Sequence, residues 1–164
     1  MSEIPSTPGG SNPALVRVPA GQDRFGERRG LGISHIDYKV TAQDSGGSLL
    51  ILENIFHAPG GPPRHLHLAQ DEVFYSLEGE FVFEIGAERF TLKPGDSVLA
   101  PRQVPHVWAY VGAGRGRILI TFTPAGQMEA FFRETTKANA MPPQDADLLR
   151  AHGMELLGPP LKVG

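Results

Sequence analysis

The chain has 164 residues, of which 40% are apolar, and these values suit a single domain with one core. The formal net charge is −3, and the densest basic cluster, "GERRG", is too small to bind nucleic acid electrostatically. No run approaches the roughly 20 apolar residues of a membrane span, and the N-terminus lacks the pattern of a secretory signal. Cysteine is absent, which excludes disulfides and thiol catalysis. We therefore expect a cytoplasmic protein that binds neither nucleic acid nor membranes.

The first two segments of the chain differ in hydrophobic pattern. Residues 1–30 are rich in Pro, Gly and Ser, and we interpret them as an N-terminal arm, mobile or loosely draped. Residues 31–125 carry short β-type runs such as "ISHIDYKVT" and "SLLILENIFH", separated by turn residues. About eight or nine such runs predict an all-β sandwich or barrel rather than βαβ units.

The last segment, residues 126–164, predicts a C-terminal extension with two short helices. In "GQMEAFFRETTKA", the residues Met128, Phe131 and Phe132 fall on one helical face. In "PPQDADLLRAHG", Asp145 is placed to cap a second helix. We expect both helices to pack on the outside of the barrel, with the two phenylalanines making that contact.

The stretch "PRHLHLAQDEVF" contains a pattern typical of metal ligands. Residues two apart on a strand point to the same face, roughly 6.6 Å apart along the chain, so His65 and His67 project together. Glu72 opens the next strand after a short turn and can return to the same interior. His106 begins a distant strand in "PRQVPHVWAY", which antiparallel folding can bring beside the pair. Three imidazoles and one carboxylate suit one divalent transition metal: Fe, Mn, Ni, Co, Cu or Zn.

Four other polar side chains are assigned no function. His35, His57 and His152 lack companions at ligand spacing, and we interpret them as structural or surface residues. Arg102 lies in the loop before the last metal-ligand candidate, and we interpret it as a solvated side chain.

The spacing of the first histidine pair resembles the first motif of the cupin superfamily. His65, Leu66, His67, four residues, Glu72, six residues and Gly79 match this motif. The leading glycine is displaced, because proline occupies position 59 and glycines follow at positions 60 and 61.

The region around the last histidine resembles the second cupin motif. Gly95, five residues, Pro101 and then His106 match it. Position 103 is Gln where the motif has Gly, and position 110 is Tyr where the motif has Asn. Neither departure affects a candidate metal ligand.

The resemblance implies a fold and a site. It implies a small jelly-roll β-barrel over roughly residues 33–124 and frequent dimerisation, so we expect a homodimer. It assigns the ligand positions to His65, His67, Glu72 and His106. The run "GPPLKVG" near the end is similar to the tails of quercetin-dioxygenase-like cupins.

Strand alternation predicts what surrounds the metal. Phe74 falls on the face of Glu72, and Trp108 and Tyr110 fall on the face of His106. The strand "RILITFT" offers either a set that includes Phe122 or the complementary set. A largely apolar and aromatic pocket is typical of a site for a small organic ligand, although each aromatic also fits plain core packing. The candidate substrate-pocket residues are Phe74, Trp108, Tyr110 and Phe122.

Three functions remain open on the sequence. The favoured one, by resemblance to the quercetinase-like cupins, is a metal-dependent dioxygenase for a small enol or phenol, in which Glu72 takes or shares the substrate proton. The second is a non-redox metal-dependent isomerase, cyclase or lyase, which more polar pocket residues would favour. The third is a non-catalytic barrel that binds a small ligand. Fold analogy does not choose among these functions.

Overall fold

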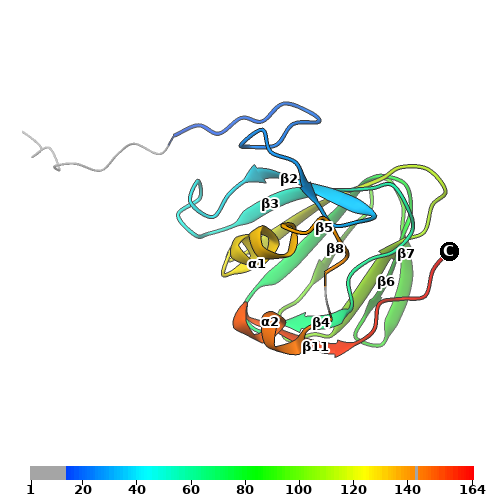
Figure 1. Ribbon diagram of the computed structural model, residues 1–164. Helices are drawn as coiled ribbons and strands as arrows, with labels where there is room; N and C mark the ends of the chain where they lie inside the picture. Colours follow the sequence, from blue (N-terminus) through cyan, green and yellow to red (C-terminus); the bar gives the residue numbers. More distant parts are fainter. Residues whose placement is uncertain (1–13, 143) are drawn as a thin grey trace, which may run out of the picture.

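The computed structural model describes residues 14–142 and 144–164, which form two antiparallel β-sheets packed face to face (Figure 1). The six-stranded sheet has the order β1 (Arg29–Gly30), β2 (Ser34–Val40), β3 (Leu50–Phe56), β10 (Gly116–Thr123), β5 (Asp71–Glu78) and β8 (Ser97–Ala100). The five-stranded sheet has the order β11 (Met154–Gly158), β4 (Arg64–His67), β9 (His106–Tyr110), β6 (Phe81–Ile85) and β7 (Glu88–Leu92). The predicted all-β fold class is confirmed.

Alternating burial along the strands explains why the two sheets face each other. In β10 every second residue is buried, and this selects Ile118, Ile120 and Phe122 as the inward set of the two that the sequence offered. In β5 Phe74 and Ser76 point inward while Tyr75 is exposed. The core between the sheets is rich in aromatic rings, which bury large apolar areas in edge-to-face pairs.

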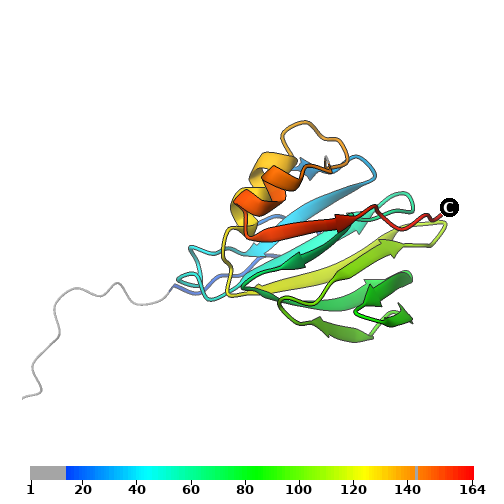
Figure 2. The same cartoon turned by 90° about the horizontal axis from the view of Figure 1, so that it is seen from below.

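Two short helices lie side by side at one end of the barrel (Figures 1 and 2). Helix α1 (Met128–Thr135) packs toward the six-stranded sheet, and helix α2 (Ala146–Ala151) lies beside β11 and β4. Asp145 caps α2 as predicted, because its carboxylate accepts hydrogen bonds from the backbone N–H groups of Asp147 and Leu148 at 3.0 and 3.1 Å.

The observed boundaries differ from the predicted ones at both ends of the chain. The predicted helical extension, residues 126–164, also contains β11, which pairs with β4 and so completes the five-stranded sheet. The sequence "MELLG" is too short for its alternation to distinguish a strand from a loop. It becomes a strand because β4 has an edge that is otherwise free to pair with it. The predicted arm, residues 1–30, falls partly outside the described residues, and its last two residues form β1.

The arm is fixed to the barrel from Asp23 onward. The Asp23 carboxylate accepts hydrogen bonds from the Arg29 side chain and from the backbone N–H of Tyr38, both at 2.7 Å. The Arg29 guanidinium lies over the Tyr38 ring, 4.5 Å from its centroid. This part of the arm is therefore held by a buried ion pair.

Within the described residues, no helix is long and apolar enough to cross a membrane.

Candidate metal centre

Strands β4, β5 and β9 bring the four predicted ligands together inside the barrel. Along β4, His65 and His67 are buried while Arg64 and Leu66 alternate to the other face. His65 is paired in register with His106 of β9, and Glu72 enters from β5. One ligand atom from each of His65, His67, Glu72 and His106 can be chosen so that all four lie within 4.8 Å of one another. This group of four side chains is called the His/Glu cluster below.

Backbone carbonyls orient two of the imidazoles. His65 donates its Nδ1–H to the carbonyl of Pro63 at 2.6 Å, and His106 donates its Nδ1–H to the carbonyl of Val104 at 3.2 Å. A carbonyl oxygen only accepts, so in the neutral rings the Nε2 atoms carry the lone pairs. A backbone carbonyl that accepts from the second ring nitrogen and so orients the imidazole is typical of metal-binding histidines.

The other contacts of the His/Glu cluster need a cation. Glu72 Oε2 lies 3.0 Å from Nε2 of His106 and 3.0 Å from Nε2 of His67. The contact with His106 has hydrogen-bond geometry, whereas neither ring nitrogen of the buried His67 has a hydrogen-bond partner among the described residues. Buried polar atoms without partners are unfavourable, and a carboxylate oxygen that faces the Nε2 lone pair of a neutral His67 or His106 is repelled unless a proton or a metal ion lies between the two atoms. The donor set and its unpartnered nitrogens therefore fit a divalent transition metal.

The electrostatics of the cluster favour the metal-binding protonation state of His65 and of Glu72, whereas His106 is held toward its protonated form as long as it donates to Glu72. Burial, with a contribution from the neighbouring imidazoles, lowers the pKa of His65 to about 3, so this ring is neutral. Burial alone would raise the pKa of Glu72, but His67 and His106 lower it below its usual range. Burial opposes protonation of His106, but its hydrogen bond to Glu72 raises the pKa of His106. A neutral imidazole and an ionised carboxylate are the ligand forms of these groups.

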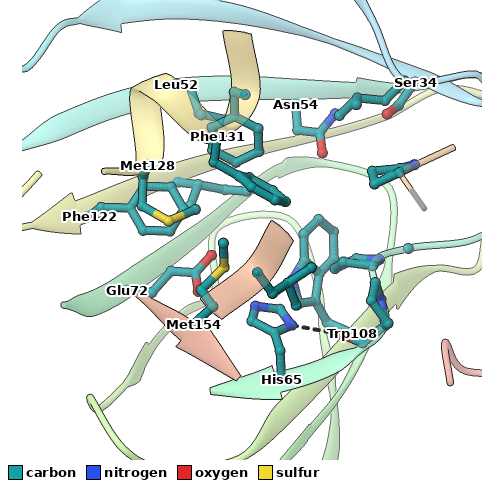
Figure 3. A pocket seen from close by; sticks show the side chains of 18 of the residues that line it. Ser34, Leu52, Asn54, His65, Glu72, Trp108, Phe122, Met128, Phe131 and Met154 are labelled. Atoms are coloured by element: carbon teal, nitrogen blue, oxygen red, sulfur yellow. Dashed lines mark hydrogen bonds between the residues drawn. The ribbon is translucent and has the colours of Figure 1, made fainter. Parts of the chain in front are cut away.

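The cluster opens into a cavity that both sheets and both helices enclose (Figure 3). His65, His67 and Glu72 form one end of it. Leu52 and Ile120 come from the six-stranded sheet, and Leu149 comes from α2. The remaining lining residues are Leu31, Ile33, Ser34, Asn54, Phe56, Gly61, Pro62, Pro63, Trp108, Phe122, Met128, Phe131, Phe132, Met141, Pro142 and Met154.

The four candidate pocket residues divide into two pairs. Trp108 and Phe122 line the cavity. Phe74 and Tyr110 are not among its lining residues. Phe74 packs in the core, with its ring centroid 5.4 Å from that of Trp108. Alternation correctly placed Phe74 on the buried face of β5, but the ring packs against Trp108, which lines the cavity in its place.

Tyr110, the residue that departs from the second motif, fills a space left by glycines. A Cβ at Gly79, Gly112 or Gly116 would approach its ring or hydroxyl to less than 3 Å, so only glycine fits at these positions. The backbone of Tyr110 forms two hydrogen bonds with the backbone of Gly60, at 2.9 and 3.1 Å. The side chain is therefore a core residue of the barrel.

Gln103, the other departure, has a left-handed backbone conformation, which glycine adopts more readily than other residues. Its φ is +64°, in the left-handed region that is costly for a residue with a Cβ. Its backbone N–H donates to the carbonyl of His67 at 2.7 Å. The loop before β9 therefore holds the end of β4, where a candidate ligand sits.

Sequence reasoning missed several cavity residues. Phe131 and Phe132 were expected only to join α1 to the barrel, and Met128 was only placed on the same helical face, but all three line the cavity. Helical periodicity gives the inward face of a helix but not what that face covers. Asn54 carried a usable signal, because it is a polar residue inside the mostly apolar run "SLLILENIFH". Ser34 carried none.

The residues assigned no function lie outside the cluster. His35 and His57 stack on each other at the surface, with 2.9 Å between Nδ1 and Nε2. His152 follows α2 and forms a 2.8 Å hydrogen bond with the carbonyl of Leu148. Arg102 is paired with Asp71 at the surface through two side-chain contacts of 3.1 Å.

Known proteins match both the sequence and the fold. Residues 55–122 match the family model described as the cupin domain. An uncharacterized protein of Methanocaldococcus jannaschii is 33% identical over 48 residues, which cover 29% of this chain and only 38% of that protein. The stretch in common is thus well under half of either chain.

Solved structures extend the likeness to the fold. An RmlC-like cupin from Shewanella frigidimarina superposes with a TM-score of 0.55 at 23% identity, covering 71% of this chain and 96% of that chain. KdgF from Halomonas sp. gives 0.52 at 21% identity, covering 60% and 86%. A nucleoside dehydratase from Streptomyces gives 0.54 at 11% identity, covering 82% and 87%. At these identities the likeness is one of fold. The family match is thus to the part of the barrel between the end of β3 and β10, and the solved structures share the fold of the barrel.

Proposed function

We propose that this protein is a metal-dependent dioxygenase that acts on a small, mainly apolar enol or phenol. The observation that carries the proposal is the position of the His/Glu cluster at the end of an apolar, aromatic cavity. A polar ligand such as a sugar needs many hydrogen-bonding partners, and this lining offers few. An aromatic or enolic molecule needs an apolar enclosure and one point at which its oxygen is held.

His65, His67, Glu72 and His106 would hold the metal. When bound, the ion supplies a Lewis-acid centre and, if it is Fe, Mn, Co, Ni or Cu, a redox-capable one. Glu72 has a second task, because its Oε1 makes no hydrogen bond with any described residue while Oε2 faces the two imidazoles. Oε1 is therefore the atom that accepts the proton of the substrate hydroxyl.

The apolar lining assists this chemistry in two ways. Trp108 and Phe122 present flat faces against which an aromatic or enolic substrate packs. Helix α1 contributes Met128 and Phe131, which cover the cavity and exclude water from it. Exclusion of water strengthens the interaction between a substrate oxyanion and the cationic centre.

Metal content is the decisive first measurement. We expect untagged wild-type protein to carry close to one equivalent of a first-row transition metal by mass spectrometry. His67→Ala should lose it, whereas His57→Ala, which removes a surface histidine, should retain it. Wild type that neither carries nor takes up a divalent metal would contradict the proposal.

Oxygen consumption then separates the enzyme classes. Protein loaded with Fe, Mn, Co, Ni or Cu should consume dioxygen with phenols, flavonols or β-diketones, and Glu72→Gln should not. Turnover without oxygen uptake would point to a non-redox isomerase, cyclase or lyase. Tight binding without any turnover would point to a ligand-binding barrel.

A further inference from the structure

The polar lining of the cavity is divided between two places. Besides the three residues of the His/Glu cluster, the polar residues among the described lining are Ser34 and Asn54. Both come from the other sheet, Ser34 from β2 and Asn54 from β3. Figure 3 shows them close to each other, on the opposite side of the cavity from His65 and Glu72.

Strand register places Ser34 and Asn54 on one inner face. Ser34 lies opposite Phe56 and Ile36 lies opposite Asn54, so the serine and the asparagine are diagonal neighbours across β2 and β3. Diagonal neighbours of this kind have Cβ atoms about 7 Å apart, which lets their polar atoms reach the same group. One small ligand group can therefore contact both.

These two side chains keep hydrogen-bonding capacity that the protein does not use. Asn54 is 6% exposed and donates from Nδ2 to the carbonyl of His35 at 3.0 Å, which fixes the orientation of its amide. Its Oδ1 has no hydrogen-bond partner among the described residues. Ser34 is 5% exposed, and its hydroxyl also has none there. Neither atom belongs to the fully enclosed polar atoms without partners, so both remain open to the cavity that their residues line and are available to a ligand group that enters it.

We propose that Ser34 and Asn54 bind a hydroxyl group of the ligand at the end remote from the His/Glu cluster. A hydroxyl donates to Asn54 Oδ1 and accepts from the Ser34 hydroxyl, which matches both side chains at once. The inference rests on the proposed function for the identity of the group at the cluster end. The substrate class is then an apolar, aromatic or enolic compound with two oxygen functions, one at each end.

The test compares diols with matched mono-ols. Calorimetry would measure binding of hydroquinone against phenol, and of 2,6-dihydroxynaphthalene against 2-naphthol, to zinc-loaded protein without oxygen. Trp108, the single tryptophan, lines the cavity, so quenching of its fluorescence by the two benzene compounds reports that they enter it. At least one diol should bind wild type about tenfold more tightly than its mono-ol, as expected for one well-formed hydrogen-bonding contact.

Two substitutions should remove this preference. Asn54→Leu and Ser34→Ala should each bring the diol to the affinity of the mono-ol while leaving mono-ol binding intact, which also shows that the variant is folded. Ser76→Ala is the matched control, because Ser76 is a buried inward serine whose hydroxyl bonds to Gly79 outside the cavity. It should retain the wild-type preference.

The outcomes separate this inference from the proposed function. Equal affinities for diol and mono-ol in wild type, an unchanged preference in both variants, or no binding of any diol would overturn the inference. Repeating the titrations with EDTA-treated protein tests it without the metal. A diol preference that persists there and disappears in Asn54→Leu, in a protein that takes up no metal, would support the inference while contradicting the proposed function.

Discussion

Two buried carboxylates of this chain, Asp23 in the arm and Glu72 in the barrel, have opposite surroundings. Asp23 accepts four hydrogen bonds: two on Oδ1, from the Arg29 side chain and the backbone of Tyr38, and two on Oδ2, from backbone N–H groups. Its lone pairs are therefore filled by the protein. Its partner Arg29 is also buried, with 6% of the side chain exposed.

Glu72 has the same charge and a similar depth but is left incomplete. It forms one hydrogen bond, with His106, and lies beside a ring of His67 whose nitrogens have no hydrogen-bond partner among the described residues. A carboxylate with every lone pair filled stabilises the fold. A carboxylate among imidazole lone pairs instead keeps its binding capacity for a cation. Completeness of hydrogen bonding, and not burial, separates the two kinds of site.

The largest change in the free energy of unfolding is expected at Asp23, the carboxylate whose hydrogen bonds are all made by the protein. Asp23→Asn should lower the free energy of unfolding by about 3 kcal/mol, because it removes the buried one of the two carboxylates paired with Arg29, leaves only the exposed Glu27 as its countercharge, and places an amide N–H against backbone donors. Urea unfolding of the EDTA-treated protein measures this change. Metal content should be unchanged, and a loss of metal in this variant would break the distinction between the two sites.

The pH dependence of the stability difference between wild type and Asp23→Asn tests whether the ionised Asp23 carboxylate is responsible. Burial alone would raise the pKa of Asp23, but the hydrogen bonds from Arg29 and from the backbone lower it. A lowered pKa in the folded state means that the stabilisation is present above the unfolded pKa, near 3.9, and is lost as the pH falls through the folded value. The difference between wild type and Asp23→Asn should therefore shrink from pH 6 toward about pH 3.

The next largest change in stability is expected when a metal binds the His/Glu cluster, where Glu72 has one side-chain hydrogen bond among the described residues. Zinc at one hundred times its dissociation constant should stabilise wild type by about 2.7 kcal/mol, seen as a higher melting temperature, because it binds only the folded cluster. Glu72→Gln should lose most of this increment, since an amide is a weak ligand and carries no charge. Thermal unfolding with zinc and with EDTA measures both. An equal zinc effect in the two proteins would place the metal elsewhere.

The smallest effect is expected at an exposed ion pair. Arg102 and Asp71 form two side-chain contacts of 3.1 Å, but their side chains are 45% and 32% exposed. Arg102→Ala should change the free energy of unfolding by less than about 1 kcal/mol, because water screens the pair. Urea unfolding beside Asp23→Asn would show the contrast, and a cost as large as that of Asp23→Asn would contradict it.

The local parts of this structure could be predicted from the sequence. Period-two alternation identified the inward residues of β5, and the spacing of two histidines, a glutamate and a distant histidine identified the four side chains that now lie together. These features depend on strand geometry and on a few residues near in sequence. The capping residue Asp145 was equally local.

The missed parts depend on contacts between distant segments. Strand β11 exists because β4 offers it an edge, and Tyr110 leaves the cavity lining because glycines at three separate positions make room for its ring. Ser34 becomes a cavity residue through the register of β2 with β3. None of these contacts is visible in the period of a single strand, since each is decided by a partner far along the chain.

The order of the elements along the chain has a consequence for biosynthesis. All four residues of the His/Glu cluster precede α1, α2 and β11, the elements that cover the cavity from its helical end. A chain made from its N-terminus presents the cluster strands to the solvent before the cover has left the ribosome. The elements that enclose the cavity at this end are therefore the last to be synthesised, and their folding completes the enclosure of the cluster.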